Sequence, residues 1–347
     1  MRILHLLGSN SYSGAENVVC QIISVFSNDK NTQMIYCSKD GPISNSLKER
    51  GVPFLPLKKL SVSALKKAIK VFKPDIIHAH DVRASIIASA FANKVRIISH
   101  IHCNFKNTKF VFLKSYLYLL AAKKFEKIYW VSKSSLDEYM FKDKVVDKSE
   151  VLYNVIDANL IEKKALLDKN EYLYDVCFIG RLTHQKNPQR LLKIIKNCSI
   201  IKPDIKFAVV GSGDLEMEVL KLKDELEINN NADFYGFVEN PYKILKSSKL
   251  CILTSRAEGT PMIALESMAL GVPMISTFVD GMCDLIKNGK NGYLCNTDEE
   301  FAQKIIEVVT NSDIQSTLSQ NAKKSYSNLC SVDNFKNVLS LGYKIKN

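Results

Sequence analysis

The clearest sign of the architecture is the segment Leu250-Cys-Ile-Leu-Thr-Ser-Arg-Ala-Glu-Gly-Thr-Pro-Met-Ile-Ala-Leu-Glu266. Its first four residues form an apolar run that predicts a buried strand. After a glycine-containing turn, a helix start is predicted, with Thr260 as the N-cap and Pro261 at the first helical position. A strand that leads through a turn into a helix is the repeating unit of a parallel sheet covered by helices.

The same unit recurs in both halves of the 347-residue chain, separated by a polar stretch at Asp157–Asn170. Two α/β domains, each a doubly wound Rossmann-like sheet, are therefore expected to face a cleft. We place the first domain at residues 1–160 and the second at 161–330, and the last helical segment, 331–345, is a candidate to pack back on the first. The predicted strands are Ile3–Leu7, Met34–Cys37, Ile76–His80, Val95–Ser99, Ile128–Ser132, Val151–Tyr153, Val176–Ile179, Phe207–Val210, Ala232–Tyr235, Leu250–Leu253 and Pro273–Ser276.

Composition excludes several classes of protein. Hydrophobic residues make up 46% and charged residues 24%, the balance of an ordinary globular protein rather than a disordered or disulfide-stapled one. No apolar stretch approaches the roughly 20 residues that cross a bilayer. The nine cysteines contain no C-x-x-C pair, which favours reduced thiols and a cytoplasmic protein.

The net charge of +12 is unevenly distributed. Residues 1–160 hold 24 basic and 13 acidic residues, and residues 161–347 hold 24 and 23. The first half is therefore expected to meet something anionic.

The basic segment 105–127 suggests what that partner is. Its lysines are interleaved with aromatic residues, which suits an anionic membrane surface, although nucleic-acid surfaces use similar residues. The structural alternative is an amphipathic helix whose core face is Leu113, Leu117, Leu120 and Ala121. The aromatic residues are Phe105, Phe110, Phe112, Tyr116, Tyr118 and Phe125.

A second motif, Phe178-Ile-Gly-Arg-Leu-Thr-His-Gln-Lys-Asn-Pro188, directly follows another predicted strand. Arg181 and Lys186 on this loop are suited to neutralising a diphosphate that departs during a reaction. The alternative is two ordinary surface cations.

The segment from Ser255 to Glu266 complements those cations. The unpaired amides at the start of its helix favour an anion such as phosphate. Carboxylates repel phosphate, so Glu258 and Glu266 are not expected to contact the phosphate itself. They are expected to accept hydrogen bonds from pairs of hydroxyls on the two neutral groups attached to it, a sugar and a ribose.

Three further features carry weaker signals. Gly14, in the turn after the first strand, allows a close backbone approach to a phosphate. The Gly211-x-Gly213 turn lacks the third glycine of a dinucleotide fingerprint and is read as a plain turn. His78, His80, His100 and His102 fall at the ends of two strands; the first three are expected in the core, and His102 is the candidate to face the cleft.

Together these motifs resemble the family-4 retaining glycosyltransferases of the GT-B fold. The resemblance rests on the Glu258-x7-Glu266 segment, the Phe178–Pro188 loop, Ser13-Gly-Ala-Glu16 and Tyr235-Gly-Phe-Val238. It implies that Arg181 and Lys186 hold the donor diphosphate and Glu266 the ribose. Glu258, with the backbone of Gly259, Thr260 and Pro261, would hold the transferred sugar, Gly14 would approach the phosphates, and His102 would reach the sugar ring. At Asp280-Gly-Met-Cys-Asp284 this chain has one glycine where many members carry two.

The resemblance implies sugar transfer from a nucleoside diphosphate donor, UDP favoured over GDP, to a saccharide acceptor that is lipid-linked in polysaccharide synthesis. Retention would follow a front-face path, in which the leaving phosphate oxygen takes the acceptor proton. No cofactor is expected, and no metal, because the chain has no D-x-D motif. Nucleic acid is not expected as a partner, and the location would be cytoplasmic, at the inner face of the plasma membrane. The alternatives are a nucleotide-sugar epimerase of similar fold and a non-enzymatic, basic RNA- or membrane-binding protein.

Overall fold

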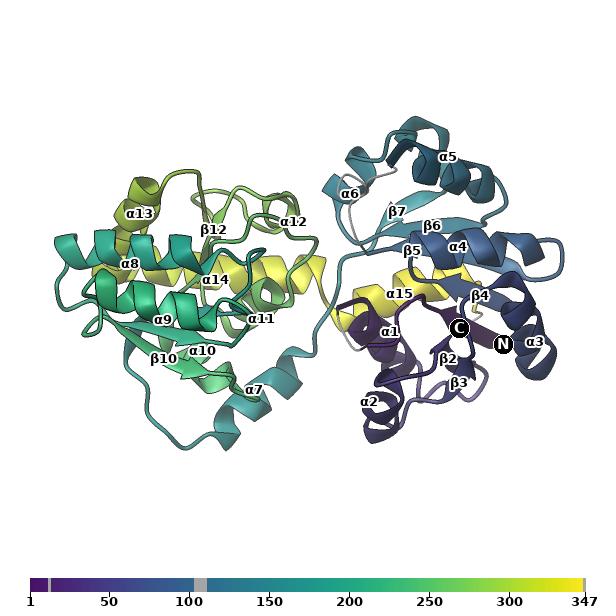
Figure 1. Ribbon diagram of the computed structural model, residues 1–347, viewed down its shortest axis with the longest axis horizontal. Helices are drawn as coiled ribbons and strands as arrows, with labels where there is room; N and C mark the ends of the chain where they lie inside the picture. The colour runs from purple at the N-terminus through teal and green to yellow at the C-terminus, as the bar shows by residue number, and fades with distance from the viewer. Residues whose placement is uncertain (12–13, 103–110, 346–347) are drawn as a thin grey trace. The chain divides into compact units, whose positions relative to one another are not determined.

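The computed structural model describes residues 1–11, 14–102 and 111–345 (Figure 1). The chain forms two compact units. Unit 1 is Met1–Val155 with Val332–Asn347, and unit 2 is Ile156–Ser331. Each unit is built on one parallel sheet with helices on its faces, so the predicted α/β fold with two doubly wound domains is confirmed.

Unit 1 has a seven-stranded sheet in the order β3-β2-β1-β4-β5-β6-β7. The strand order reverses at β1, which pairs with both β2 and β4. The strands are β1 Arg2–Leu6, β2 Gln33–Lys39, β3 Phe54–Leu57, β4 Ile76–Ala79, β5 Arg96–Ile101, β6 Lys127–Trp130 and β7 Ser149–Val151; the helices are α1 Gly14–Val25, α2 Ile43–Glu49, α3 Val62–Phe72, α4 Val82–Ala88, α5 Val111–Ala122, α6 Lys133–Asp137 and α15 Val332–Tyr343.

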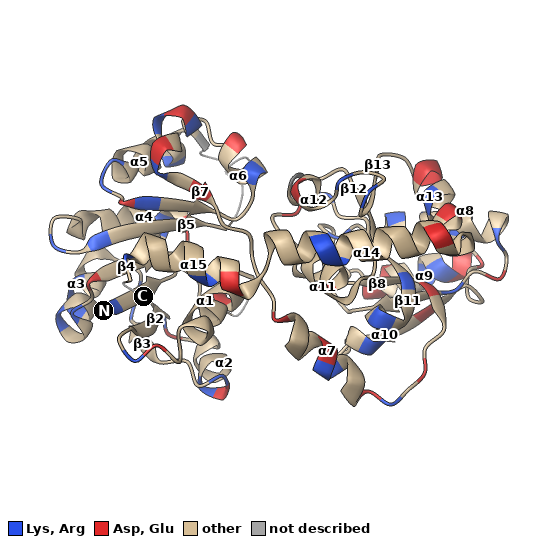
Figure 2. Cartoon of the chain, turned by 180° about the vertical axis from the view of Figure 1, so that it is seen from behind, with Lys and Arg blue, Asp and Glu red and all other residues tan. Residues whose placement is uncertain are grey.

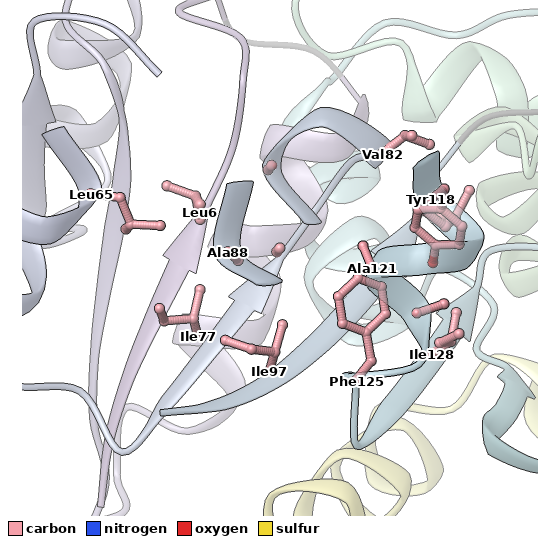
Figure 3. Close-up of a cluster of buried hydrophobic side chains, with 14 of the residues drawn as sticks. Leu6, Leu65, Ile77, Val82, Ala88, Ile97, Tyr118, Ala121, Phe125 and Ile128 are labelled. Atoms are coloured by element: carbon pink, nitrogen blue, oxygen red, sulfur yellow. The ribbon is translucent and has the colours of Figure 1, made fainter. Parts of the chain in front are cut away.

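Both faces of this sheet are covered, which explains why its strands are continuous apolar runs. Successive strand residues point to opposite faces. Thus Leu6 and Ile77 join the core under α3, α4 and α5 (Figure 3), whereas Ile3 and Ile76 join a second core. That second core includes residues of α1 and α15.

The C-terminal helix α15 packs on unit 1. Phe335, Leu339 and Tyr343 are buried against its second core. The guanidinium of Arg96 donates to the backbone oxygens of Gly342 and Tyr343 at 3.2 and 2.9 Å. These contacts fasten the end of the chain to a central strand of the first sheet.

Unit 2 has a six-stranded sheet in the order β10-β9-β8-β11-β12-β13, and its order reverses at β8. Helix α7 forms within the stretch Asp157–Asn170, which composition had marked only as polar. The strands are β8 Tyr174–Ile179, β9 Phe207–Val210, β10 Ala232–Gly236, β11 Ser248–Leu253, β12 Met274–Thr277 and β13 Gly292–Cys295; the helices are α7 Ala158–Leu167, α8 Pro188–Ile201, α9 Glu216–Glu225, α10 Tyr242–Ser247, α11 Met262–Leu270, α12 Asp280–Leu285, α13 Asp298–Thr310 and α14 Ser312–Leu329.

The prediction for the core face of α5 is wrong. The helix buries Tyr118, Leu119, Ala121 and Ala122, so only Ala121 of the predicted set lies in the core. Tyr118 is buried in the core instead of the leucines, and its hydroxyl is satisfied there by a hydrogen bond with the Ser99 hydroxyl of β5. The opposite side of α5 carries an exposed apolar stripe, each side chain 42–64% exposed: Phe112, Leu113, Tyr116, Leu117 and Leu120.

The aromatic residues of segment 105–127 therefore divide. Tyr118 and Phe125 are core residues, while Phe112 and Tyr116 are exposed. Phe105 and Phe110 lie outside the described residues. Among the residues that the structure describes, no helix has the length and apolar character needed to cross a membrane. The described cysteines are free thiols, and all but Cys283 are buried.

Candidate active site

The loops that follow β8, β9, β11 and β12 meet at the carboxyl edge of the unit 2 sheet. This is the edge where doubly wound sheets bind ligands, next to the strand at which the order reverses. The loop after β9 packs backbone to backbone on the loop after β8. A Cβ on Gly211, whose φ is +134°, would lie 1.9 Å from the Gly180 oxygen. The Gly211-x-Gly213 turn is thus required by packing.

Arg181 lies immediately after β8 on an exposed part of this edge. Its guanidinium has no hydrogen-bond or ion-pair partner among the described residues. The loop beneath it is fixed, because Gly180 N donates to Val210 O at 2.9 Å and Leu182 N donates to Ser212 O at 2.9 Å. A cation on a fixed loop with no partner of its own is available to an anionic ligand.

Lys186 and Glu258, from two different loops, form an ion pair. Lys186 Nζ donates to Glu258 Oε1 at 2.5 Å, and the side chains are 14% and 8% exposed. Ser255 Oγ donates to the same oxygen at 2.6 Å. The carboxylate is therefore held by one cation and one hydroxyl, and the ammonium is oriented by that carboxylate.

Further hydrogen bonds hold these two loops together. Thr254 Oγ1 donates to the Lys186 oxygen at 2.9 Å, and Gln185 Nε2 donates to the Ala257 oxygen at 3.0 Å. Arg256 donates to Asn187 Oδ1 at 3.0 Å. The cationic loop and the two-glutamate segment thus form one connected structure within unit 2.

The start of α11 differs from the prediction by one residue. The helix begins at Met262, and Pro261 is its N-cap, with an extended backbone at ψ 130°. Thr260 therefore precedes the cap and does not form it. Pro261 itself has no side-chain group that could cap the helix by a hydrogen bond. Close to this start, Gly281 N donates to the backbone oxygen of Glu258 at 3.2 Å. A Cβ on Gly281 would lie 1.0 Å from the backbone oxygen of Gly259.

Glu266 lies one turn into α11 and is partly exposed. Tyr242 Oη donates to its Oε1 at 3.1 Å. Burial raises the pKa of Glu266 above its ordinary value of 4.5, while the Tyr242 hydrogen bond and Lys164 oppose the shift. Sequence reasoning missed Tyr242, because nothing in its own segment marks it as a partner of α11.

In unit 1, Gly14 is the first residue of α1, and a Cβ placed on it would meet no atom within 4 Å. No described residue therefore fills the space in front of Gly14. The preceding turn is fastened at Gly8, whose amide donates to Asp81 Oδ2 at 2.8 Å.

Five of the six histidines form one cluster at β1, β4 and β5. His78, His80 and His100 are buried, as predicted, and His102 is partly exposed just after β5. His5, which the sequence analysis did not include, joins them from β1. Burial lowers the pKa of all five, to about 3 for His5 and His102, so they are neutral at neutral pH.

Comparison with known proteins finds relatives along most of the chain. Residues 12–160 match the model of Glycosyltransferase Family 4, and residues 160–325 match that of Glycosyl transferases group 1. The chain is 27% identical to an Escherichia coli UDP-Gal:alpha-D-GlcNAc-diphosphoundecaprenol alpha-1,3-galactosyltransferase, over 94% of this chain and 92% of the relative. It is 29% identical to the uncharacterized glycosyltransferase MJ1059 of Methanocaldococcus jannaschii, over 65% of this chain and 60% of that protein's length.

Solved structures show the same fold. Anabaena Alr3699/HepE, crystallised in complex with UDP, superposes with a TM-score of 0.87 at 19% identity, covering 99% of this chain and 100% of the other. With both halves matched in order and the fold shared, the chain belongs to the family-4 glycosyltransferases of the GT-B fold.

Proposed function

We propose that this glycosyltransferase moves a sugar from a nucleoside diphosphate donor to a hydroxyl of a lipid-linked saccharide during cell-surface polysaccharide synthesis. The observation that carries the proposal is the connection of the Arg181–Lys186 loop to the Glu258 segment within unit 2. Cations for a pyrophosphate and carboxylates for sugar hydroxyls are thereby held on one sheet edge.

In this proposal Arg181 and Lys186 bind the diphosphate, and the N-terminal end of α11 adds to the positive field. Glu266, oriented by Tyr242, accepts hydrogen bonds from the ribose. Glu258 and the Gly259–Pro261 backbone hold the transferred sugar, Gly14 approaches the phosphates, and His102 contacts the sugar ring. UDP is the preferred nucleotide, since the Escherichia coli relative is named for UDP-Gal and the Anabaena protein was crystallised with UDP.

Transfer is proposed to retain the anomeric configuration without a metal ion. A double-displacement route would need a carboxylate nucleophile beside the sugar. Glu258 is a poor nucleophile, because its Oε1 accepts hydrogen bonds from Lys186 and Ser255. We therefore favour the front-face route, in which the leaving phosphate oxygen takes the acceptor proton. Arg181 and Lys186 then supply the charge stabilisation that a metal would otherwise provide.

The acceptor is proposed to lie at the cytoplasmic face of the plasma membrane. The Escherichia coli relative is named for a diphosphoundecaprenol-linked acceptor. In this chain the exposed apolar stripe of α5 is accompanied by Lys114, Lys123 and Lys124. Helix α3, which carries blue segments in Figure 2, adds Lys66, Lys67 and Lys70 without an acidic residue. Apolar side chains that enter the headgroup region beside lysines suit an anionic lipid surface.

The test has two stages. First, a thermal-shift screen against UDP- and GDP-sugars identifies the donor, because a ligand that binds the native state raises the melting temperature. The selected donor is then incubated with and without a diphosphate-lipid-linked saccharide, in the presence and absence of EDTA. A product with retained configuration that requires the acceptor and survives EDTA supports the proposal. A change in the donor sugar without acceptor supports the epimerase instead, and the absence of any stabilising nucleotide sugar rejects both.

A further inference from the structure

The histidine cluster of unit 1 contains a continuous line of hydrogen bonds. His5 Nδ1 lies 2.9 Å from His80 Nε2, and His80 Nδ1 lies 3.1 Å from His102 Nε2. Both ring nitrogens of His80 are therefore engaged. The line runs from β1, through the end of β4, to the residue after β5, which are three neighbouring strands of the sheet. We call His5, His80 and His102 the histidine line.

The three rings are neutral, so each has one N–H donor and one bare acceptor nitrogen. This makes their tautomers interdependent. If His80 donates from Nδ1 to His102, its Nε2 must accept from His5. If His80 instead accepts at Nδ1 from His102, its Nε2 must donate to His5. The tautomer of His102 is thus tied to that of His80, and that of His80 to His5.

The buried end of the line selects one of these two directions. His5 Nε2 is buried and has no hydrogen-bond partner among the residues that the structure describes. If His5 donates from Nδ1, this unpartnered atom is a bare nitrogen. If His5 accepts at Nδ1, the atom is an N–H group, and buried N–H groups without an acceptor are the rarer and more costly case. The favoured direction therefore runs from His5 through His80 to His102.

We propose that His80 is a positioning residue that fixes His102 as the Nδ1–H tautomer. His102 Nε2 accepts from His80, and His102 Nδ1, which has no partner among the described residues, presents an N–H donor to an oxygen of the transferred sugar. The inference rests on the proposed function for the contact with sugar, but the tautomer itself is a property of the free protein. It gives His80, which the sequence analysis expected to be a core residue, a role in substrate recognition.

Two neighbouring histidines are outside the line. His78 Nδ1 is paired with Tyr343 Oη at 2.7 Å. The rings of His100 and His102 are in contact, with centroids 4.1 Å apart and a tilt of 35°, and the two nitrogens of His100 have no hydrogen-bond partner in the described part of the chain. One nitrogen from each of His80, His100 and His102 also lies within 4.8 Å of the other two, and the same holds for His5, His78 and His80. Imidazole nitrogens at this spacing are suited to a transition metal, so metal binding is a rival outcome of the test.

The tautomer is measured directly on the full chain labelled with ¹⁵N-histidine. Two-bond ¹H–¹⁵N spectra distinguish the Nδ1–H form from the Nε2–H form, and His102→Gln identifies the His102 signals by their loss. We expect wild-type His102 to be the Nδ1–H tautomer. A wild-type His102 that carries its proton on Nε2 overturns the proposal, whether or not any variant folds.

Two variants of His80 test its role. His80→Phe keeps an aromatic ring but removes both nitrogens, and it should release His102 toward the Nε2–H form. With the identified donor, kcat/KM should fall roughly tenfold, the value of one lost hydrogen bond. His80→Asn returns an N–H donor near the position of Nδ1 and should restore both the tautomer and the activity. An unchanged His102 tautomer in His80→Phe contradicts the proposal.

The rival is tested on the same sample. Stoichiometric metal in the purified protein, or loss of the tautomer pattern on adding one equivalent of Zn²⁺, would replace the histidine line with a metal site. If the protein binds no nucleotide sugar but His102 is the Nδ1–H tautomer and responds to His80→Phe, the proposed function fails while the positioning role of His80 stands.

Discussion

Lys186 Nζ and Glu258 Oε1 lie 2.5 Å apart at the carboxyl edge of the second sheet, and both side chains are largely buried. The two residues were assigned to different parts of the donor, the diphosphate and the transferred sugar. Their contact means that the buried ammonium is neutralised by a carboxylate of the protein itself. One ion pair thereby sets the position of both groups.

A double-mutant cycle on this pair should show strong coupling. Lys186→Met leaves the Glu258 carboxylate without its cation, and Glu258→Gln leaves the ammonium without its anion, so each single variant should lower the melting temperature. The double variant should be more stable than the sum of the two effects predicts, with a coupling energy of about 1–3 kcal/mol. Additive losses measured by denaturant unfolding would mean that the pair contributes nothing specific.

Arg181→Ala should reduce turnover on the order of 10²-fold, because a donor to the developing diphosphate charge is lost. Its melting temperature should stay unchanged, since the Arg181 side chain has no partner among the described residues. Lys193→Ala, which removes an exposed cation from α8, is the matched control and should keep full activity. Equal kcat values for the Arg181 variant and this control would reject the role.

As the pH falls, nucleotide binding should begin to weaken at a higher pH than the pKa of an ordinary glutamate would predict. The pKa of Glu266 is raised above 4.5 by burial, so the carboxylate takes up its proton earlier as the pH falls. Below that raised pKa the neutral group loses acceptor capacity for the ribose hydroxyls. Calorimetry with UDP between about pH 7.5 and pH 5 should show wild-type affinity falling more steeply than that of Glu266→Gln. Parallel curves would contradict the assignment, since the titration of UDP itself is common to both proteins.

The apolar stripe of α5 should govern binding to lipid. Replacing Leu113 and Leu117 with serine should weaken sedimentation with vesicles containing phosphatidylglycerol by roughly tenfold or more, given the apolar area withdrawn. The control replaces Leu173 and Ile200, two exposed apolar residues of unit 2, with serine. Equal losses in both double variants, or no binding by the wild type, would show that the stripe is not a lipid-binding surface.

Helix α15 should contribute strongly to the stability of unit 1. Leu339→Ala removes a fully buried side chain from the core that α15 shares with α1, at a cost of about 2–5 kcal/mol. Denaturant unfolding followed by the fluorescence of Trp130, the single tryptophan and a buried residue of unit 1, reports on this unit. A shift comparable to that of an exposed replacement such as Leu341→Ala would show that α15 is not part of this core.

The sequence predicted the buried strands well because both faces of each sheet are covered, which makes the strands continuous apolar runs. It missed elements whose patterns are weak. Strand β3 contains Pro56 and lies at the sheet edge, where a missing N–H is tolerated. Strand β13 has four residues and starts at Gly292. The core face of α5 was misjudged because Tyr118, a residue of mixed character, is buried through its hydrogen bond with Ser99.

At the candidate site, the motifs predicted four functional residues but not the contacts that position their side chains. The four residues are Arg181, Lys186, Glu258 and Glu266. The Lys186–Glu258 contact spans 72 residues and the histidine line joins residues 75 and 22 positions apart. Such pairs depend on strand order, which local patterns do not encode. His5 was missed for the same reason, since a single histidine in an apolar strand carries no signal until its neighbours are known.

The most direct test of the central claim compares the affinities of UDP, GDP and the matching nucleosides for the wild type and for Arg181→Ala by calorimetry. The account predicts that the wild type binds one nucleoside diphosphate far more tightly than its nucleoside, and that Arg181→Ala loses most of this difference. If the wild type binds the diphosphate no better than the nucleoside, or if Arg181→Ala keeps the full difference, the loop after β8 is not a pyrophosphate site and the account is wrong.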